Sequence, residues 1–219
     1  MANTLQDPAV AAELDRMYTE SKNQMSQLRA MHDKLGRPMT AQERAEAMSE
    51  FYIPVTPESG RLLYSLVRAS RPATVVEFGM SFGISAIHLA SAVRDNGTGR
   101  VVTTELSETK IASAKQTFAT TGLDDVITIL EGDALSTLTD LDGSVDFVLL
   151  DGWKDLYRPV IELLEPRMPA GVLVVADNAS APDMAPYLDY VRDPGNGYVS
   201  FNFLVRDSDS MEISCRTVD

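Results

Sequence analysis

Few residues of this sequence carry a thiol or an imidazole. Of the 219 residues, one is cysteine, Cys215, and two are histidine, His32 and His88. A lone cysteine cannot form an internal disulfide, which fits a reducing cytoplasm. A catalytic thiol needs a neighbouring base, and no pattern in the sequence places either histidine beside Cys215. We therefore expect Cys215 to be packed and inert.

Long apolar segments and positive charge are also scarce. No apolar run approaches the roughly 20 residues that span a membrane, and no basic segment followed by an apolar one opens the sequence. We therefore expect no membrane segment, no signal peptide and a cytoplasmic protein. Lys and Arg number 19 against 32 Asp and Glu, which gives a formal net charge of -13. Because this charge repels phosphate backbones, the sequence argues against a nucleic-acid partner.

Helical spacing dominates the first third of the chain. Apolar residues recur at helical intervals from Pro8 to about Leu35. A second helix is predicted after Thr40, which opens a capping box with Glu43. A third is predicted after Thr56-Pro57, where threonine caps and proline takes the first helical position. We expect these helices to pack on the sheet described next, or to form a homodimer contact.

From Ala73 onward, short apolar runs alternate with helical segments. The predicted strands are residues 74–78, 100–104, 126–130, 145–150 and 171–176. Such alternation favours a parallel sheet with helices on both faces. Residues 198–205 and 211–216, which a polar turn joins, have the signature of an antiparallel hairpin. The sequence therefore predicts an α/β fold with a Rossmann-like, doubly wound, mostly parallel sheet, an antiparallel C-terminal hairpin and extra N-terminal helices.

The first predicted strand runs into a glycine-containing turn. Gly79 and Gly83 stand where the strand becomes a helix, and glycine there allows a tight turn and close approach of a ligand. The spacing differs from the Gly-x-Gly-x-x-Gly of nicotinamide-binding turns. Glu77 would repel a pyrophosphate but suits a ligand with a cationic amine and a sulfonium. An ordinary glycine-rich turn remains the alternative.

Acidic residues end three successive predicted strands. Glu77 ends the first, Glu105 the second, and Asp133 follows the third. This order fits an adenosyl ligand, because Glu105 could accept hydrogen bonds from both ribose hydroxyls and Asp133 could face the adenine amino group. Each acid alone is also typical of a solvated loop or a helix cap, Asp133 in particular.

The next two strand ends carry oxygen ligands. Asp151 follows the fourth predicted strand, and Asp177 and Asn178 follow the fifth. Because the carboxyl ends of adjacent parallel strands border one crevice, we expect these side chains to converge. Two carboxylates and an amide suit Mg²⁺, whereas the alternative is that both acids only cap helices. Lys154 stands on the same rim and, beside a cation, could act as a general base rather than as an ordinary surface lysine.

These motifs resemble one known family, the metal-dependent catechol O-methyltransferase-like enzymes. The resemblance lies in Asp151-Gly152-Trp153-Lys154-Asp155, Asp177-Asn178 and the segment from Glu77 to Ala86. It runs from about Tyr52 to the C-terminus. It implies S-adenosylmethionine as the cofactor, Mg²⁺ as the metal and transfer of a methyl group to a hydroxyl of a catechol-like or polyphenolic small molecule.

The resemblance also implies a role for each matching residue. The cofactor residues would be Val55, Glu77, Gly79, Ser81, Ser85, Glu105, Asp133, Ala134, Asp151 and Trp153. The metal ligands would be Asp151, Asp177 and Asn178, the general base would be Lys154, and Lys154, Asn178 and Glu212 would contact the substrate. Residues 1–70 would form a helical cap, and residues 71–219 the cofactor- and metal-binding sheet, within a single methyltransferase domain spanning residues 1–219.

Two departures from the catechol enzyme stand out. Gly152 takes the place of a histidine, and Phe51 and Ile53 occupy the stretch that matches the aromatic-lined catechol slot. A nicotinamide-dependent oxidoreductase is the alternative enzyme, although its glycine triad is missing. A non-catalytic cofactor-binding protein is the other alternative, and the presence of Lys154 beside all three metal ligands argues against it.

Overall fold

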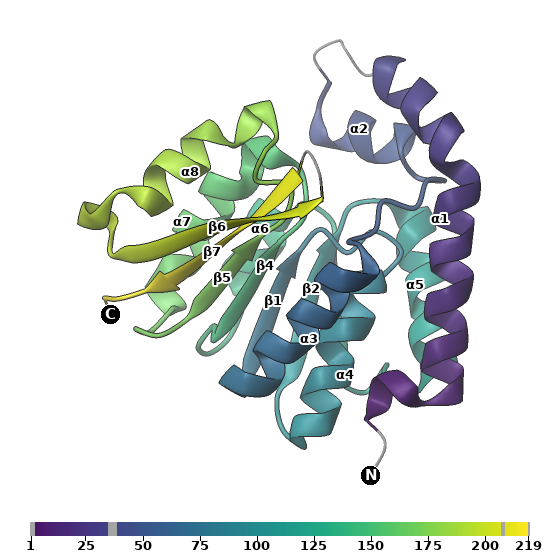
Figure 1. The fold of residues 1–219 in the computed structure, drawn as a ribbon, viewed down its shortest axis with the longest axis horizontal. Helices are drawn as coiled ribbons and strands as arrows, with labels where there is room; N and C mark the ends of the chain where they lie inside the picture. Colours follow the sequence, from purple (N-terminus) through teal and green to yellow (C-terminus); the bar gives the residue numbers. More distant parts are fainter. Residues whose placement is uncertain (1–2, 35–38, 207–208, 219) are drawn as a thin grey trace.

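A single sheet organises the computed structural model, which describes residues 3–34, 39–206 and 209–218. Seven strands of these residues follow the order β3-β2-β1-β4-β5-β7-β6 (Figure 1). Their bounds are β1 Thr74–Phe78, β2 Arg100–Glu105, β3 Ile127–Glu131, β4 Phe147–Leu150, β5 Leu173–Ala176, β6 Tyr198–Arg206 and β7 Asp209–Arg216. Strands β1 to β5 are parallel, and β7 pairs antiparallel with both β5 and β6. The predicted mixed sheet is confirmed.

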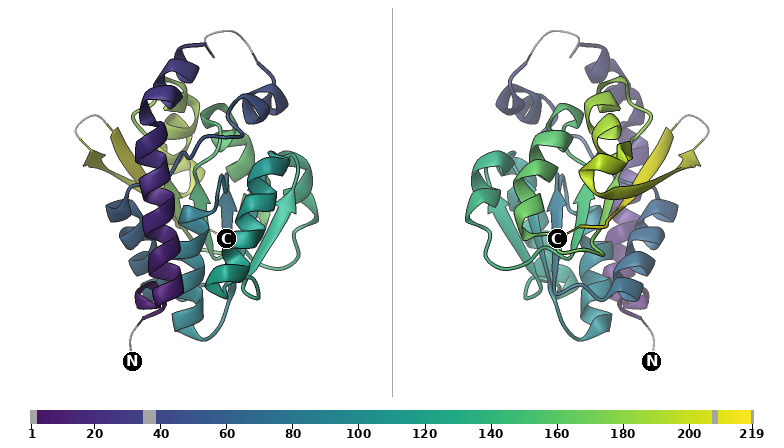
Figure 2. Two further views of the ribbon diagram at one scale, coloured as in Figure 1. Left: turned by 90° about the vertical axis from the view of Figure 1, so that its right-hand side faces the viewer. Right: turned by 90° about the vertical axis from the view of Figure 1, so that its left-hand side faces the viewer.

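Helices cover both faces of this sheet, as the two side views show (Figure 2). They are α1 Pro8–Lys34, α2 Ala41–Ala47, α3 Pro57–Ser70, α4 Ile84–Asn96, α5 Glu108–Thr121, α6 Ala134–Thr137, α7 Tyr157–Leu164 and α8 Ala185–Arg192. Helices α1, α3, α4 and α5 share one apolar core with the sheet, and α6, α7 and α8 share the other. The fold is therefore doubly wound.

The central strands read as unbroken apolar runs because both of their faces are buried. In β1, Val75 belongs to the core under α4 and Val76 to the core under α7. Three predicted strands nevertheless begin one or two residues too early, since the observed strands start at Ile127, Phe147 and Leu173. The backbone N–H of Val145, for example, donates to the carbonyl of Arg167 in a loop. Gly171 adopts a φ of 96°, outside the range of a strand.

The two predicted caps begin their helices as expected. The side chain of Thr40 accepts from the backbone N–H of Glu43, whose own side chain accepts from the backbone of Thr40. Thr56 caps α3, with Pro57 at its first position. The predicted end of the first helix, at about Leu35, lies outside the described residues.

The long helix α1 packs on the molecule. Val10, Leu14 and Met17 are buried in the core that α1 shares with α4 and α5. This confirms packing as one of the two expected roles of the N-terminal helices, and the homodimer contact stays a prediction. No helix in the described ranges is long and apolar enough to cross a membrane.

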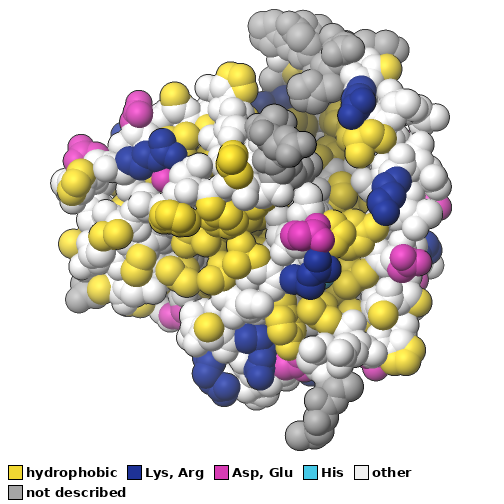
Figure 3. Space-filling view, in the orientation of Figure 1, with side chains coloured by type: hydrophobic (Ala, Val, Ile, Leu, Met, Phe, Trp, Pro, Cys, Tyr) yellow, Lys and Arg dark blue, Asp and Glu magenta, His cyan; other side chains and the backbone are white. Residues whose placement is uncertain are grey.

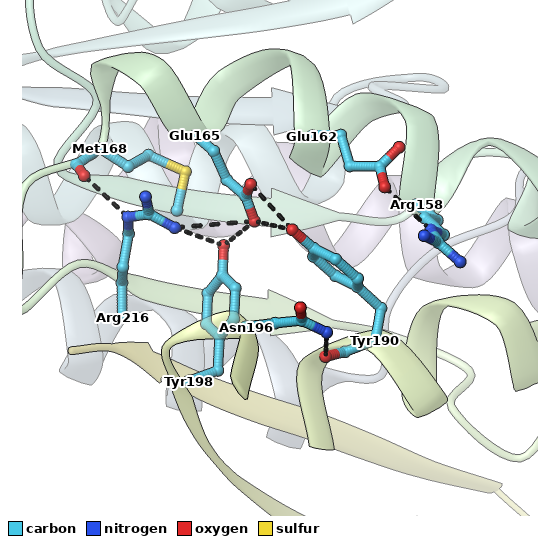
Figure 4. Close-up of polar contacts among 8 residues, drawn as sticks. All are labelled: Arg158, Glu162, Glu165, Met168, Tyr190, Asn196, Tyr198 and Arg216. Atoms are coloured by element: carbon cyan, nitrogen blue, oxygen red, sulfur yellow. Dashed lines mark hydrogen bonds and ion pairs between the residues drawn. The ribbon is translucent and has the colours of Figure 1, made fainter. Parts of the chain in front are cut away.

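A polar cluster fastens the C-terminal hairpin to α7 and α8 (Figure 4). Glu165, just after α7, accepts hydrogen bonds from the hydroxyls of Tyr190 at 2.9 Å and Tyr198 at 2.7 Å. Arg216 lies 3.6 Å from the same carboxylate and donates to the carbonyl of Met168. Since Tyr198 begins β6 and Arg216 ends β7, the cluster lies at the opposite end of the sheet from the carboxyl ends of β1 to β5.

The outer strand β6 exposes apolar side chains on one face. Ser200 and Asn202 hydrogen-bond toward α8 and β7. The alternate residues Val199 and Phe201 are 67% and 66% exposed. Figure 3 shows hydrophobic side chains at the surface in this region. The helices of the first face therefore leave this edge of the sheet uncovered in the described part of the chain.

His88 is enclosed between α1, α3 and α4. Its Nε2 lies 3.3 Å from the hydroxyl of Tyr18 on α1. A Cβ at Gly60 on α3 would overlap the imidazole ring, so glycine permits this close approach. Burial, together with the charge of Arg61, lowers the pKa of His88 from 6.5 to about 4.

We expect this histidine to make the fold sensitive to mild acid. Between pH about 6.5 and 4 the unfolded chain binds a proton that folded His88 does not, so the free energy of unfolding falls as pH falls. The full loss is roughly 3 kcal/mol and is absent above pH about 6.5. Chemical denaturation of the protein and of His88→Gln across this range measures the difference. Equal slopes for both proteins would contradict the assignment.

Candidate functional site

The crevice of the candidate site lies between the carboxyl ends of β1 and β4. From these neighbouring strands the chain turns to opposite faces, β1 into α4 and β4 into α7. Gly79 has a φ of 96°, and a Cβ there would lie 2.6 Å from the backbone N and Cα of Gly152. A ligand crevice at such a switch point is typical of open α/β sheets. The two loops thus touch backbone to backbone, and Asp151 lies at their contact.

A narrow pocket opens beside this contact. It is lined by Tyr52, Ile53, Pro54, Met80, Ser81, Phe82, Ile84, Ser85 and Asp151. The rings of Tyr52 and Phe82 stack with centroids 4.1 Å apart and form one wall. Three of the residues predicted for the cofactor, Ser81, Ser85 and Asp151, therefore share one pocket. Val55 is buried in the core nearby rather than among the lining residues.

Glu105, at the end of β2, holds the loop on one side of this pocket. Its carboxylate accepts from the backbone N–H of Ser81 at 2.7 Å and from those of Leu106 and Ser107 at 2.9 Å. Ser81 is fixed in the left-handed region, with a φ of 52°. The Nζ of Lys110, a lysine only 5% exposed, donates to the Ser81 hydroxyl. Two carboxylate oxygens have about four lone-pair positions, so Glu105 can still accept from a ligand hydroxyl.

Glu77 lies beneath the same loop and is fully buried. The hydroxyl of Thr103 on β2 donates to its carboxylate. Burial raises the pKa of Glu77 to about 7, the hydroxyls of Ser85 and Thr103 lower it, and the charge of Glu105 raises it. A cationic ligand group beside Glu77 would favour its ionised form.

Asp133 is a helix cap, the alternative role expected for it from the sequence. Its side chain caps α6, with the backbone N–H of Leu135 and the hydroxyl of Ser136 as donors. The residue is exposed, whereas Ala134 is buried. Because the N–H of Gly132 donates to the carbonyl of Glu105, the ends of β2 and β3 are adjacent. Asp133 and Ala134 therefore follow the strand next to Glu105, but neither lines the narrow pocket.

Lys154 connects the residues that follow β4 and β5. Its Nζ lies 3.7 Å from Oδ1 of Asp151 and donates to the hydroxyl of Tyr157 at 2.6 Å. That hydroxyl donates in turn to the backbone carbonyl of Asp177 at 3.2 Å. The side chain of Asp177 is buried, and the N–H of Asp177 donates to Leu150 on β4. Asp151, Lys154 and the backbone of Asp177 are thus connected through Tyr157, and the convergence of the Asp151, Asp177 and Asn178 side chains stays a prediction.

Burial and charge act on the lysine in opposite directions. Burial lowers the pKa of Lys154, because the charged ammonium loses hydration. The carboxylates of Asp151, Asp177 and Asp209 raise it. A cation that neutralised these carboxylates would remove their support and would favour the neutral amine.

Asn178 is held in a defined orientation by the hairpin. Its φ is 56°, an uncommon value for a residue with a side chain. Its Nδ2 donates to Oδ2 of Asp209 at 2.7 Å. Because a carboxylate only accepts, the amide nitrogen must face Asp209, and the amide oxygen is left for another donor or for a metal.

The residues after β4 and β5 fit a hard cation by their donor chemistry. Asp151, Asp177 and Asn178 supply two carboxylates and an amide oxygen, the ligand types that Mg²⁺ prefers. Among the described residues, no group of three or more His, Cys, Asp or Glu side chains is arranged to hold a metal ion. The predicted set contains only two such side chains and an amide, so it would depend on water or substrate oxygens for its remaining ligands.

Helix α2 contacts the segment that follows β4 through an arginine. The guanidinium of Arg44 pairs with both carboxylate oxygens of Asp155 at 2.9 Å. Its Cζ lies 4.7 Å from the centroid of the Trp153 ring. Trp153 therefore has a cationic side chain on one face, and the predicted apolar wall is partly covered by the helical cap.

Glu212 requires a correction. It pairs with Ala176 across β5 and β7, but its side chain points toward α8 and is 1% exposed. Arg192 donates to both of its oxygens at 2.7 Å, and Asn202 donates at 2.8 Å. Because this buried carboxylate faces Arg192 on α8, a substrate hydroxyl would have to displace these partners, and we do not assign Glu212 to the site.

Around Lys154 and Asn178, the residues Tyr157 and Asp209 were absent from the predicted set. Tyr157 stands three positions after Lys154, about one helical turn, and this spacing could have suggested the contact. Asp209 reaches Asn178 from the end of the hairpin, 31 positions away. No local signal in the sequence indicates that pairing.

Known methyltransferases are similar to this chain in sequence. A family model described as a methyltransferase domain matches residues 76–179. Catechol O-methyltransferase of Sus scrofa is 30% identical over 145 residues, 63% of this chain and 77% of that protein. The Mus musculus enzyme is 30% identical over 171 residues, 74% of this chain but only 64% of its own length. The match thus spans slightly less than two thirds of that relative.

Solved structures share the fold. The structure of an O-methyltransferase from Bacillus cereus in complex with SAH has a TM-score of 0.69 and 19% sequence identity. The match covers 92% of this chain and all of that one. At this identity the likeness concerns the fold alone, and it agrees with the doubly wound sheet.

We expect Gly152 to be intolerant of a side chain. A Cβ there would lie 2.5 Å from the Phe78 ring, which itself packs edge-on against Tyr157. Gly152→Ala should therefore lower the free energy of unfolding by roughly 1–3 kcal/mol through overpacking. Chemical denaturation measures this loss. Adding Phe78→Leu to Gly152→Ala should recover part of it, and failure to recover any would show that the ring is not the obstacle.

Proposed function

Since the chain belongs to the catechol O-methyltransferase-like family of S-adenosylmethionine-dependent O-methyltransferases, we propose that it methylates a hydroxyl of a phenolic small molecule. The preferred acceptor class is a catechol-like compound or a polyphenol with vicinal hydroxyls. The observation that carries the proposal is the contact of Lys154 with Asp151 at the mouth of the Ser81 and Ser85 pocket. A base beside a cofactor pocket is the arrangement that methyl transfer to a hydroxyl needs.

The pocket residues would hold the cofactor by its charged and polar ends. Glu77 would attract the cationic methionine part, with Val55, Gly79, Ser81, Ser85 and Asp151 around it. Glu105 would accept from the ribose hydroxyls. Asp133 and Ala134 would lie beside the adenine, with Trp153 as an apolar wall. Holding sulfur, methyl and acceptor oxygen in line would supply most of the rate enhancement.

A divalent cation fits the oxygen donors after β4 and β5. Asp151, Asp177 and Asn178 would hold Mg²⁺ by carboxylate and amide oxygens. When bound, it would supply Lewis-acid stabilisation of a phenolate. Lys154 would take the proton from the acceptor hydroxyl, and Asn178 would lie beside the same acceptor.

The direct test is methyl transfer itself. We expect purified protein with S-adenosylmethionine and Mg²⁺ to convert members of a polyphenol panel to products heavier by one methylene, measured by mass spectrometry. Chelation should abolish the conversion. Lys154→Ala should lower kcat by about 100-fold or more, the usual contribution of a general base. Lys115→Ala is the matched control, because Lys115 is exposed and pairs only with Glu131 among the contacts described.

Two other outcomes would favour the alternatives. Cofactor binding without transfer to any phenol would support a non-catalytic binding protein. Tight binding of a nicotinamide dinucleotide in place of S-adenosylmethionine would support an oxidoreductase. Full activity of Lys154→Ala at neutral pH would remove the lysine from the mechanism.

Cofactor binding should release a proton near neutral pH. The pKa of Glu77 is raised to about 7 in the empty pocket, and a cationic ligand favours the ionised carboxyl. Affinity should therefore fall as pH falls below about 7, by at most tenfold per pH unit. Calorimetric titration with S-adenosylmethionine between pH 5.5 and pH 7.5 measures this, a window of about two units around that pKa.

Glu77→Gln is the variant that tests the source of the proton. It should bind more weakly at pH 7 and lose the pH dependence below that value. His88 does not contribute to this pH dependence of affinity, because burial lowers its pKa to about 4 and it stays neutral in this range. An equally steep pH dependence in Glu77→Gln would assign the proton to another group.

A further inference from the structure

We propose that the hydroxyl of Tyr157 is a positioning group, which holds Nζ of Lys154 beside Asp151, where the proposed function places the base. This inference rests on the proposed function. Tyr157 is the first residue of α7, and its hydroxyl lies between Lys154 and the backbone carbonyl of Asp177.

The Tyr157 ring is fixed before any ligand binds. It is fully buried, with Phe78 edge-on at a centroid distance of 6.1 Å and Tyr187 edge-on at 5.7 Å. Phe78 is itself packed against Gly152 at the switch point of the sheet. The hydroxyl position is therefore set by the core and not by the flexible lysine.

The direction of each hydrogen bond follows from the acceptor at the end. A carbonyl oxygen only accepts, so the tyrosine proton must point to the carbonyl of Asp177, 3.2 Å away. The hydroxyl oxygen can then only accept from Nζ of Lys154, at 2.6 Å. An N–H of the lysine must therefore point at Tyr157.

A neutral amine has two N–H groups and one lone pair. One N–H points to Tyr157, and the carboxylate of Asp151 at 3.7 Å attracts the other. Tyr157 therefore fixes the position of the nitrogen that takes the proton. In the proposed reaction the acceptor O–H bond breaks, its proton joins the lone pair of the amine, the oxygen takes the methyl, and the sulfur keeps the electron pair of the broken S–C bond. Tyr157 keeps its own proton throughout.

Removing the hydroxyl alone tests this arrangement. We expect Tyr157→Phe to lower kcat about tenfold, the effect of losing one hydrogen bond to a reacting group, with KM for both substrates unchanged. Tyr187→Phe is the matched control, because it removes a hydroxyl from the neighbouring buried ring without touching Lys154. Calorimetric affinity for S-adenosylmethionine should be alike in the two variants, and their melting temperatures check that both are folded.

An acceptor with a more acidic hydroxyl distinguishes a positioning role of Tyr157 from a general structural defect. A nitro-substituted catechol needs less help from a base than catechol itself, so the defect of Tyr157→Phe should shrink with it. The defect of Lys154→Ala should shrink in parallel. A purely structural defect would lower kcat by the same factor for both acceptors, and that result would overturn the inference.

The outcomes also distinguish this inference from the proposed function. If the unmodified protein transfers no methyl group, or if Lys154→Ala is fully active, the proposed function itself fails. If Lys154→Ala is impaired and Tyr157→Phe behaves like Tyr187→Phe, the proposed function stands and only the role of Tyr157 is wrong.

Discussion

At the carboxyl ends of β1 and β4, a Cβ at Gly79 would overlap the backbone of Gly152, and a Cβ at Gly152 would overlap the ring of Phe78. This contact follows from the reversal of winding, since β1 turns into α4 on one face and β4 into α7 on the other. It brings the loop that holds Ser81 against the loop that holds Asp151. The site therefore depends on two glycines, Gly152 through the absence of a Cβ and Gly79 also through its positive φ.

Burial has opposite effects on the two ionisable groups at the edges of the crevice. The pKa of Glu77 is raised and that of Lys154 is lowered, since each loses hydration in its charged form. A cationic ligand near Glu77 favours its charged state, and a cation at Asp151 and Asp177 removes the carboxylates' support for the charged lysine. Ligand binding would therefore bring both groups to the charge states that the proposed chemistry uses.

Much of this was readable from the sequence because parallel strands end at one edge. The sequence placed the acids and the amide at the ends of two successive strands, and these strands, β4 and β5, are neighbours in the sheet. The direction in which a side chain points was harder to predict from the sequence. Glu212 matched a short motif, yet its strand register turns it to α8, where Arg192 binds it. The three-residue spacing between Lys154 and Tyr157 is apparent in the sequence. The role of Tyr157, however, depends on the carbonyl of Asp177, which only folding brings near it.

The parallel and antiparallel halves of the sheet contribute different residues around the crevice. The pocket beside β1 is built by the parallel half, whereas Asp209 reaches Asn178 from β7, the antiparallel half. At its far end the hairpin is fastened through Glu165 and Arg216, away from the crevice. At its near end the N–H of Ala179 donates to the carbonyl of Ser210. Hydrogen bonds therefore hold β7 near both of its ends, so the position of Asp209 beside Asn178 is set by the anchoring of the hairpin.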